Sequence, residues 1–247
     1  LDILVGRLGI LRDRRAGRIE FFHLWYQEFL AARHIVQSGL DERTVQRFLG
    51  MPSFAGVLPY VAGLLSSERS CALLTQVEIR DPFTFCRAIA ETVLDDEQRA
   101  RLLDRVVSHG SDMAPQMPVR IELGPALACT GNASIPLLLL ALSDGSRSDY
   151  ERRSCLEALA LMDAGAPFDS ALLRELEVAE TGLQWHVIEH IGRRRIEAAR
   201  GLLTQYRSHP DPIVAADAHW ALAELGDAVL DVPDAVLSAV LDCLSVE

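Results

Sequence analysis

The stretch DPIVAADAHWALAELGD, at residues 211–227, decides the fold of this chain. Asp211 and Pro212 favour the start of a helix, because aspartate caps free backbone N–H groups and proline fits the first helical turn. Alanine and leucine fill the middle of the stretch, and Gly226 provides a break. The pattern predicts a short apolar helix that needs neighbouring helices to cover its surface.

The same pattern occurs four times in the second half of the chain. Each segment has an alanine- and leucine-rich helix, a tight break and a second apolar helix. The first helices are predicted to end with ACTG at 128–131, ALMD at 160–163, EHIG at 189–192 and AELG at 223–226, so that their ends lie 32, 29 and 34 residues apart. The second helices are predicted at about 135–142, 170–180, 196–207 and 234–244. A helix pair that recurs every ~30 residues indicates an α-solenoid, because each pair covers the apolar faces of the next.

The opening of the chain is different. Residues 10–12 and 18–22 are β-prone runs joined by DRRAG at 13–17, in which Gly17 can supply the positive φ of a hairpin turn. A helix that Gly39 ends is predicted to follow. Its apolar stripe, at steps of three and four residues, consists of Trp25, Phe29, Ala32 and Val36.

Further helices are predicted between this helix and the repeats. They are one capped by Asp41 that ends near Gly50, one over 54–65 with a break at Pro59, and one that starts at Asp95 or Asp96 and ends at Gly110. Prolines and small polar residues predict a linker after the last of them. The predicted domains are residues 1–39, residues 40–110, the linker 111–118 and the repeats over 119–247.

Composition excludes several classes of function. All 24 basic residues are arginine, so neither a lysine-dependent phosphate loop nor a lysine Schiff base can form. Residues 51–247 carry a charge of −13, from 16 arginines against 29 acidic residues, and residues 1–50 carry +2, which gives the net charge of −11. Such an acidic arm repels a phosphate backbone, so nucleic acid is not expected as a partner. No apolar stretch reaches the ~20 residues of a membrane helix, and five scattered cysteines are typical of a reducing compartment, which predicts a cytoplasmic protein.

Residues 21–32, FFHLWYQEFLAA, resemble the motif that closes the winged-helix region of NACHT-type signalling NTPases and starts the helical arm behind it. The run LVGRLGILRDRRAGRIEF at 4–21 is similar to the short helix, strand and wing that precede this motif in the family. VLPYVAGLL at 57–65 is similar to a helix found downstream. The resemblance covers residues 1–65. Both the resemblance and the start at Leu1, without an initiator methionine, lead us to expect a piece of a longer protein.

The resemblance implies a parent protein with an effector domain and a nucleotide-binding switch, acting in bacterial signalling or defence. The arm would sense a protein ligand or hold the NTPase domain of the parent at rest, and the parent would oligomerise on activation. His23 would contact the β-phosphate of ADP bound in the parent, whereas Gln27 and Glu28 would be structural. The chain has no GxxxxGK[ST] loop of its own, so ATP and ADP are expected in the parent, and the chain is expected to hold no cofactor and to catalyse no reaction.

Residues 211–227 are similar to the short HEAT repeats that also occur in phycobilin lyase subunits, a likeness that identifies a repeat type alone. The expected fold class is therefore all-α, a HEAT-like α-solenoid with a small winged-helix β-hairpin remnant at the N-terminus. A HEAT-like subunit of a chromophore lyase or assembly factor is an alternative function. Such a subunit would lack the FFHLWYQEFLAA motif, which counts against it.

HVIEH at 186–190 matches H-x-x-E-H, the zinc motif of inverted zincin peptidases. A zinc metallopeptidase using His186, Glu189 and His190 is therefore a second alternative. However, His190 lies inside a predicted apolar stripe with His186 at its edge, as residues packed against a neighbouring repeat do. No third ligand stands out, so no metal is expected. The run RRR at 193–195 is either an anion-binding patch or a solvated helix end that offsets the helix dipole.

A protein partner is expected to bind along the second helices of the repeats, because solenoids present extended concave surfaces to their ligands. The residues predicted to face outward there are Arg174, Arg200, Thr204 and Arg207. Their three arginines would form a basic stripe for an acidic protein partner. In the intramolecular alternative, the same arginines pair with Glu177 and Glu197 of the chain itself.

Overall fold

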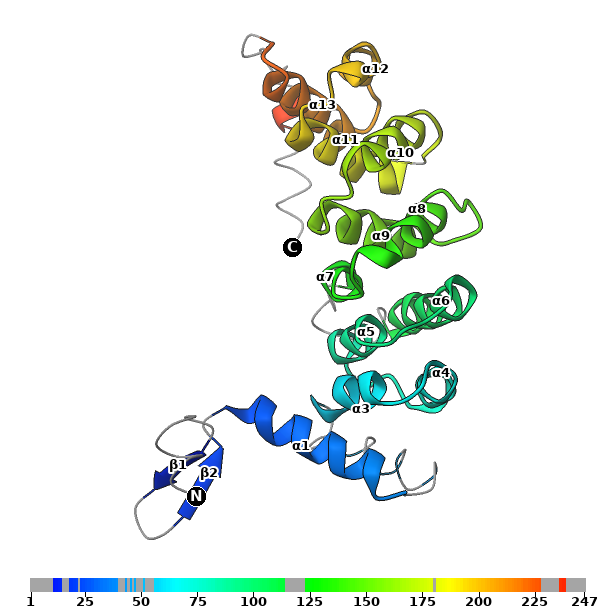
Figure 1. Cartoon of the computed structure of the whole chain (residues 1–247). Helices are drawn as coiled ribbons and strands as arrows, with labels where there is room; N and C mark the ends of the chain where they lie inside the picture. Colours follow the sequence, from blue (N-terminus) through cyan, green and yellow to red (C-terminus); the bar gives the residue numbers. More distant parts are fainter. Residues whose placement is uncertain are drawn as a thin grey trace. The chain divides into compact units, whose positions relative to one another are not determined.

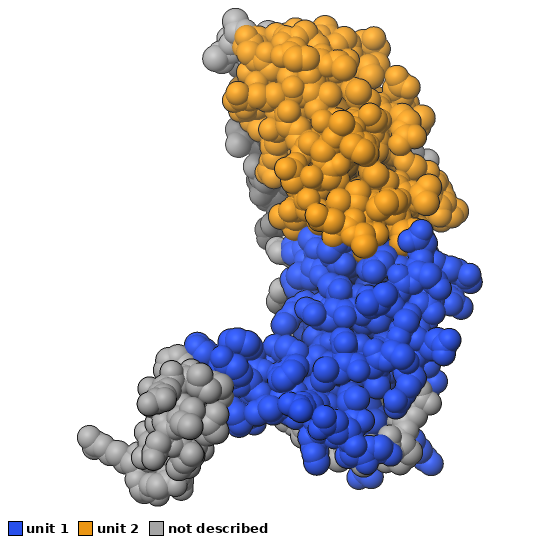
Figure 2. Space-filling model, viewed as in Figure 1, with its two compact units in different colours: residues 1–131 blue, residues 132–247 orange. Residues whose placement is uncertain are grey.

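The computed structural model describes residues 11–14, 18–21, 23–39, 43, 45, 47, 51, 56–113, 123–179, 181–227 and 236–238. These residues are mostly helical, which confirms the all-α class at that level. The chain forms two compact units, unit 1 over residues 1–131 and unit 2 over residues 132–247 (Figure 2). Phe85 in unit 1 and Phe168 in unit 2 are the largest of their fully buried side chains.

The predicted hairpin is confirmed. Strands β1 (Leu11–Arg14) and β2 (Arg18–Phe21) pair antiparallel, with Leu11 opposite Phe21 and Arg14 opposite Arg18. Gly17, to which the sequence assigned the positive φ of the turn, lies outside the described residues.

Helix α1 (Leu24–Gln37) follows β2, and Gly39, with a φ of +63°, comes directly after its end as predicted. The predicted apolar stripe is only partly right. Of its four members, Ala32 is buried and Val36 is half-buried, whereas Trp25 and Phe29 are exposed; Ile35, which was not in the predicted stripe, is buried. Spacing along a helix identifies which side chains share a face, but the burial of that face depends on what packs against it.

Among its described residues, unit 1 continues with five more helices, which lie in two rows (Figure 1). They are α3 (Leu58–Leu64), α4 (Ser67–Gln76), α5 (Pro82–Ala90), α6 (Asp96–Met113) and α7 (Leu123–Ala128). Helices α3, α5 and α7 form the first row, and α4 and α6, which pack on each other, form the second. In the first row α3 packs on α1 and α5, and α5 packs on α7. Pro59 lies in the first turn of α3, where a proline is tolerated, so it begins a helix instead of breaking one.

Local capping explains where α5 and α6 begin. The carboxylate of Asp81 accepts hydrogen bonds from the backbone N–H groups of Phe83 and Thr84 at 3.2 and 3.1 Å, and Pro82 occupies the first turn of α5. Before α6, Asp95 accepts from the N–H of Gln98 at 2.7 Å, and the side chain of Gln98 accepts from the N–H of Asp95 at 3.3 Å. This reciprocal pair is a capping box. Of the two residues predicted to start the helix, Asp95 is therefore the cap and Asp96 is the first helical residue.

The predicted end of α6 at Gly110 is wrong, because the helix continues to Met113. A Cβ at Gly110 would lie 2.6 Å from Cδ2 of Leu123, so this glycine allows α7 to approach α6 closely. The first three residues of the predicted linker, 111–113, are therefore helical, and residues 114–118 lie outside the described residues.

Unit 2 is built from helix pairs. Its helices are α8 (Ile135–Leu142), α9 (Asp149–Leu161), α10 (Gly165–Val178), α11 (Thr181–Arg194), α12 (Arg200–Tyr206) and α13 (Pro212–Glu224). Helix α11 packs on both α9 and α13, while α8, α10 and α12 pack on α9, α11 and α13 respectively (Figure 1). The second helix predicted at 135–142 is confirmed at both bounds; of the one predicted at 234–244, only residues 236–238 are described, and they are helical.

Residues with left-handed backbone follow α7, α9, α11 and α13, the helices that match the first helices of the predicted repeats. Gly131, Asp163, Arg195 and Gly226 have φ values of +80°, +48°, +54° and +87°, so the breaks lie 32, 32 and 31 residues apart. After three of them the chain closes in a Schellman motif: Ala164, Ile196 and Asp227 donate their backbone N–H to the carbonyls of Leu159, Ile191 and Leu222. The repeat is thus more regular than the sequence alone predicted.

The predicted end of the third repeat helix at Gly192 is corrected by this geometry. Helix α11 continues to Arg194, and Arg195 takes the left-handed position. A Cβ at Gly192 would lie 2.7 Å from Cζ3 of Trp220 and 2.9 Å from the Cα of Ala221. Gly192 therefore serves the close contact between α11 and α13 and does not end the helix.

Candidate functional site

The N-terminal half of α1 exposes large apolar side chains. Leu24, Trp25, Phe29 and Leu30 are 66%, 50%, 38% and 44% exposed, and we call them the α1 apolar surface. Trp25 stacks on Tyr26 with ring centroids 4.2 Å apart, and Phe29 meets Tyr60 of α3 edge to face at 6.1 Å. Four exposed large apolar side chains within two turns of one helix are more typical of a protein-binding site than single exposed apolar residues are.

His23 lies at the edge of this surface, in the N-cap position of α1, with extended backbone (φ −123°, ψ 135°). Its side chain is exposed and makes no capping hydrogen bond, and its ring lies 6.0 Å from Trp25 and 6.5 Å from Tyr26. The position at the start of the arm helix is where the family resemblance places a phosphate-contacting histidine. The contact with ADP stays a prediction.

Gln27 and Glu28, expected to be structural, differ in their surroundings. Gln27 is exposed, whereas Glu28 is half-buried. A Cβ at Gly56 would lie 2.1 Å from Oε1 of Glu28, so the carboxylate reaches the chain just before α3. Glu28 thus lies against Gly56, where a larger residue would meet its carboxylate.

The two histidines of the H-x-x-E-H motif are buried in the packing of α11. His186 stacks on Trp185 with ring centroids 3.4 Å apart, and His190 meets Phe168 of α10 edge to face at 6.2 Å. Burial, together with the positive charges of Arg193 and Arg194, lowers the pKa of His190 to about 4, so its imidazole is neutral at pH 7. Among the described residues, no group of three or more histidine, cysteine, aspartate or glutamate side chains is arranged to hold a metal ion.

Each arginine of the run 193–195 is paired with a carboxylate of the chain. Arg193 contacts Glu189 at 2.5 Å, Arg194 contacts Asp169 at 2.5 Å, and Arg195 contacts Glu224 at 3.3 Å. The hydrogen bond and charge of Asp169 raise the pKa of Arg194, whose guanidinium also lies over the ring of Phe168. These contacts favour the helix-end alternative over an anion-binding patch.

The predicted basic stripe is not uniform. Arg174 is exposed on α10, but Arg207 is partly buried, and its Nε has no hydrogen-bond acceptor. Arg200 pairs with Glu197 at 2.8 Å and with Asp227, and it also donates to the carbonyl of Leu225 at 2.7 Å. The hydroxyl of Thr204 donates to the carbonyl of Arg200 at 2.8 Å.

These contacts tie Arg200 to the C-terminal end of α13 and so favour the intramolecular alternative at that position. The role of Arg174, Thr204 and Arg207 in partner binding stays a prediction.

A pocket between α1, α3 and α4 has no counterpart in the sequence-based expectations. Its volume is about 280 Å³, and Arg69 of α4 is one of two charged residues among its lining side chains. No helix was predicted over Ser67–Gln76. The spacing of Ala72 and Leu73, three and four residues after Arg69, could have indicated that these side chains share one face of a helix.

In the part of the chain that the structure describes, no helix is long and apolar enough to span a bilayer. A scan against protein-family models, a search of curated proteins and a search of solved structures each find no significant match to this chain.

Proposed function

We propose that this chain is a non-catalytic, protein-binding regulatory arm of a NACHT-type signalling NTPase. The observation that carries the proposal is the α1 apolar surface. The same residues that resemble the NACHT-type motif, at 21–32, expose a tryptophan, a phenylalanine and two leucines at the start of the helical arm. In the proposed parent, this is the point at which the arm meets the nucleotide-binding part of the protein.

The chemistry of the surface fits a docked protein domain. Aromatic side chains are enriched in protein interfaces, because they bury a large area while losing little conformational entropy. His23 beside Trp25 would place an imidazole at the junction, where it can donate a hydrogen bond to a phosphate of bound ADP. The preferred partner is accordingly the parent's own NTPase domain in its ADP-bound resting state.

The rest of the chain would act as the scaffold of the arm. We take the helix pairs, with breaks every 31 or 32 residues, as HEAT-like repeats of an α-solenoid, and the hairpin β1–β2 as the remnant of a winged helix. A ligand that binds the arm better when α1 is undocked would shift the parent from rest to activity. Coupling of this kind requires no catalytic residue in the arm.

The test is a double variant, Trp25→Ala with Phe29→Ala, in the full-length parent. Loss of the docked surface should accelerate ADP release and cause activity without ligand. The matched control is Leu161→Ala with Val178→Ala, two side chains that are 61% and 70% exposed in unit 2. If the α1 variant stays folded by circular dichroism and retains ADP as the control does, the α1 apolar surface is not the docking site.

A separate variant, His23→Leu, tests the phosphate contact. It removes a hydrogen-bond donor and puts an apolar side chain of similar size in its place at the N-cap of α1. We expect faster ADP release from the parent and unchanged thermal stability of the arm alone, because the His23 side chain does not cap the helix. Unchanged nucleotide retention would leave His23 a packing role only.

A further inference from the structure

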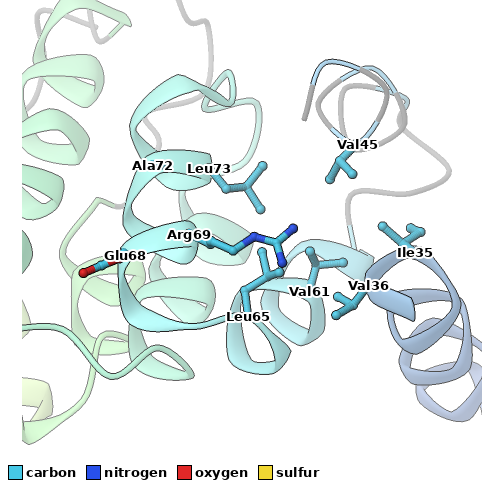
Figure 3. A pocket seen from close by; sticks show the side chains of 9 residues that line it. All are labelled: Ile35, Val36, Val45, Val61, Leu65, Glu68, Arg69, Ala72 and Leu73. Carbon is cyan, nitrogen blue, oxygen red and sulfur yellow. The ribbon is translucent and has the colours of Figure 1, made fainter. Parts of the chain in front are cut away.

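We propose that the pocket between α1, α3 and α4 binds a small amphipathic carboxylate, such as a medium-chain fatty acid or an arylalkyl carboxylate, with its headgroup on Arg69 (Figure 3). This inference concerns unit 1 alone and does not rest on the proposed NTPase parent.

The walls of the pocket are almost entirely apolar. They consist of Ile35 and Val36 from α1, Val61 and Leu65 from α3, Ala72 and Leu73 from α4, and Val45. The volume of about 280 Å³ lies near the lower end of the range of small-molecule pockets, which begins at roughly 300 Å³. Ala72 contributes to this space because its side chain is a single methyl group. The cavity therefore suits one small apolar body.

Arg69 supplies the polar group that would orient a ligand. Its guanidinium points into the pocket toward Val61, whereas the carboxylate of the adjacent Glu68 points away (Figure 3). No hydrogen bond or ion pair joins Arg69 to any other residue in the described part of the chain, although Arg193, Arg194 and Arg200 all have carboxylate partners there. Arg69 is also exposed at the mouth, so an anion can reach it from solvent.

The arrangement selects for a single negative charge. A planar guanidinium binds a carboxylate through two parallel N–H···O hydrogen bonds, and the apolar walls strengthen that pairing by excluding water from one side. A phosphate monoester carries nearly two charges and is normally bound by several donors. Here a single arginine is the only basic side chain among the described residues that line the pocket, which is too few donors for a dianion. A monocarboxylate with an apolar tail is thus the better match.

The test uses the purified chain and three probes in isothermal titration calorimetry: octanoate, 4-phenylbutyrate and the neutral octan-1-ol. We expect octanoate or 4-phenylbutyrate to bind with a stoichiometry of one. Arg69→Gln should weaken carboxylate binding by about tenfold to a hundredfold, the usual cost of a lost charged hydrogen bond, and should leave octan-1-ol binding unchanged. The matched control is Arg87→Gln, an exposed arginine of α5 that does not line the pocket, and it should bind the probes as the wild type does.

A second variant, Ala72→Leu, fills the pocket and should weaken the binding of all three probes. Equal carboxylate affinity in the wild type and Arg69→Gln would overturn the proposal, as would the absence of binding by both carboxylates. If only a peptide with an acidic and an apolar side chain binds, and Arg69→Gln abolishes that binding, the pocket is a contact site for a protein segment and the proposal is wrong. The comparison between Arg69→Gln and Arg87→Gln remains decisive even if Ala72→Leu fails to fold.

Discussion

Helices α1 and α11 carry the same kind of apolar stripe and bury it to opposite extents. In α11, Leu183, Val187 and Ile191 follow one another at steps of four residues, and all three are 0% exposed. In α1, Trp25 and Phe29 have the same spacing but are 50% and 38% exposed.

The difference lies in the neighbours. Helix α11 is packed by α9, α10 and α13, whereas α1 packs on α3 and buries only Ala32 and Ile35 among its described side chains. Periodicity thus predicts a face, and the packing decides whether the face is a core or a binding surface.

The largest expected effect compares two leucines, one from each helix. Leu183→Ala should lower the free energy of unfolding by about 3–5 kcal/mol, because it removes a fully buried side chain and leaves a cavity. Leu24→Ala should lower it by no more than about 0.5 kcal/mol, because Leu24 is already 66% exposed. Urea unfolding of both variants measures the difference. Equal losses of unfolding free energy in the two variants would show that the start of α1 is covered in solution, and the contrast between α1 and α11 would then be wrong.

The next effect depends on pH and concerns the core side of α11. Burial lowers the folded-state pKa of His190 to about 4 from an ordinary value of 6.5, so the unfolded state binds more protons between these two values. The contribution of neutral His190 to the free energy of unfolding is therefore fully present above pH 6.5. It is lost as the pH falls toward 4, by up to about 3 kcal/mol.

Two other described groups have shifted pKa values that bear on the same pH dependence, so the effect of His190 must be isolated by a variant. Burial lowers the pKa of His219, which adds to the loss on acidification, whereas burial and nearby carboxylates raise the pKa of Asp217 to about 6, which opposes it. His190→Gln should flatten the dependence of the unfolding free energy on pH between 6.5 and 4. A slope equal to that of the wild type would mean that His190 is solvated and that α10 and α11 pack less tightly than the structure shows.

A pair of glycines sharpens the same contrast at lower magnitude. Gly192→Ala should destabilise the protein by about 1–3 kcal/mol, because the added Cβ would meet Trp220 and Ala221 of α13. Gly201→Ala in α12 has open space around its Cβ and should stabilise by up to about 1 kcal/mol through higher helix propensity. Thermal unfolding of the two variants should move in opposite directions. A stabilising Gly192→Ala would contradict the close approach of α11 and α13.

The smallest effect concerns the break after α11. Arg195→Gly relieves a left-handed backbone with φ +54°, which should stabilise by about 1 kcal/mol, partly offset by the lost exposed pair with Glu224. Asp163→Gly, at the equivalent break with φ +48°, should behave alike. Thermal denaturation of both variants is the measurement. Destabilisation by more than the value of one surface ion pair would mean that Arg195 does more than end the helix.

Much of the secondary structure follows from signals within a single turn. The β1–β2 hairpin, the helix at 135–142 and the start of α13 at Asp211 and Pro212 were all predictable, because turn residues, caps and apolar spacing act over a few neighbouring residues. Helices α4 and α5 were not predicted, although the Asp81–Pro82 pair before α5 is the same signal as Asp211–Pro212 before α13.

The sites were harder to predict, because their residues interact across helices. Arg152 of α9 is buried, pairs with Glu175 of α10 and donates to the carbonyl of Leu142 of α8 at 2.9 Å. Similarly, the pairing of Arg200 with Asp227 joins residues that are 27 positions apart. Charge and spacing in the sequence do not specify such partners.

By itself, the sequence determined that the chain is mostly helical, that its helices recur as pairs, and that an apolar stripe lies on α1 and on α11. Only the tertiary structure decided that Gly110 and Gly192 are packing contacts instead of helix ends, that Arg69 points into an apolar pocket, and that the start of α1 is exposed. The physical reason is range. Capping and helix propensity act between residues one to four positions apart, whereas burial, close approach and ion pairing depend on neighbours that meet only after the helices have packed.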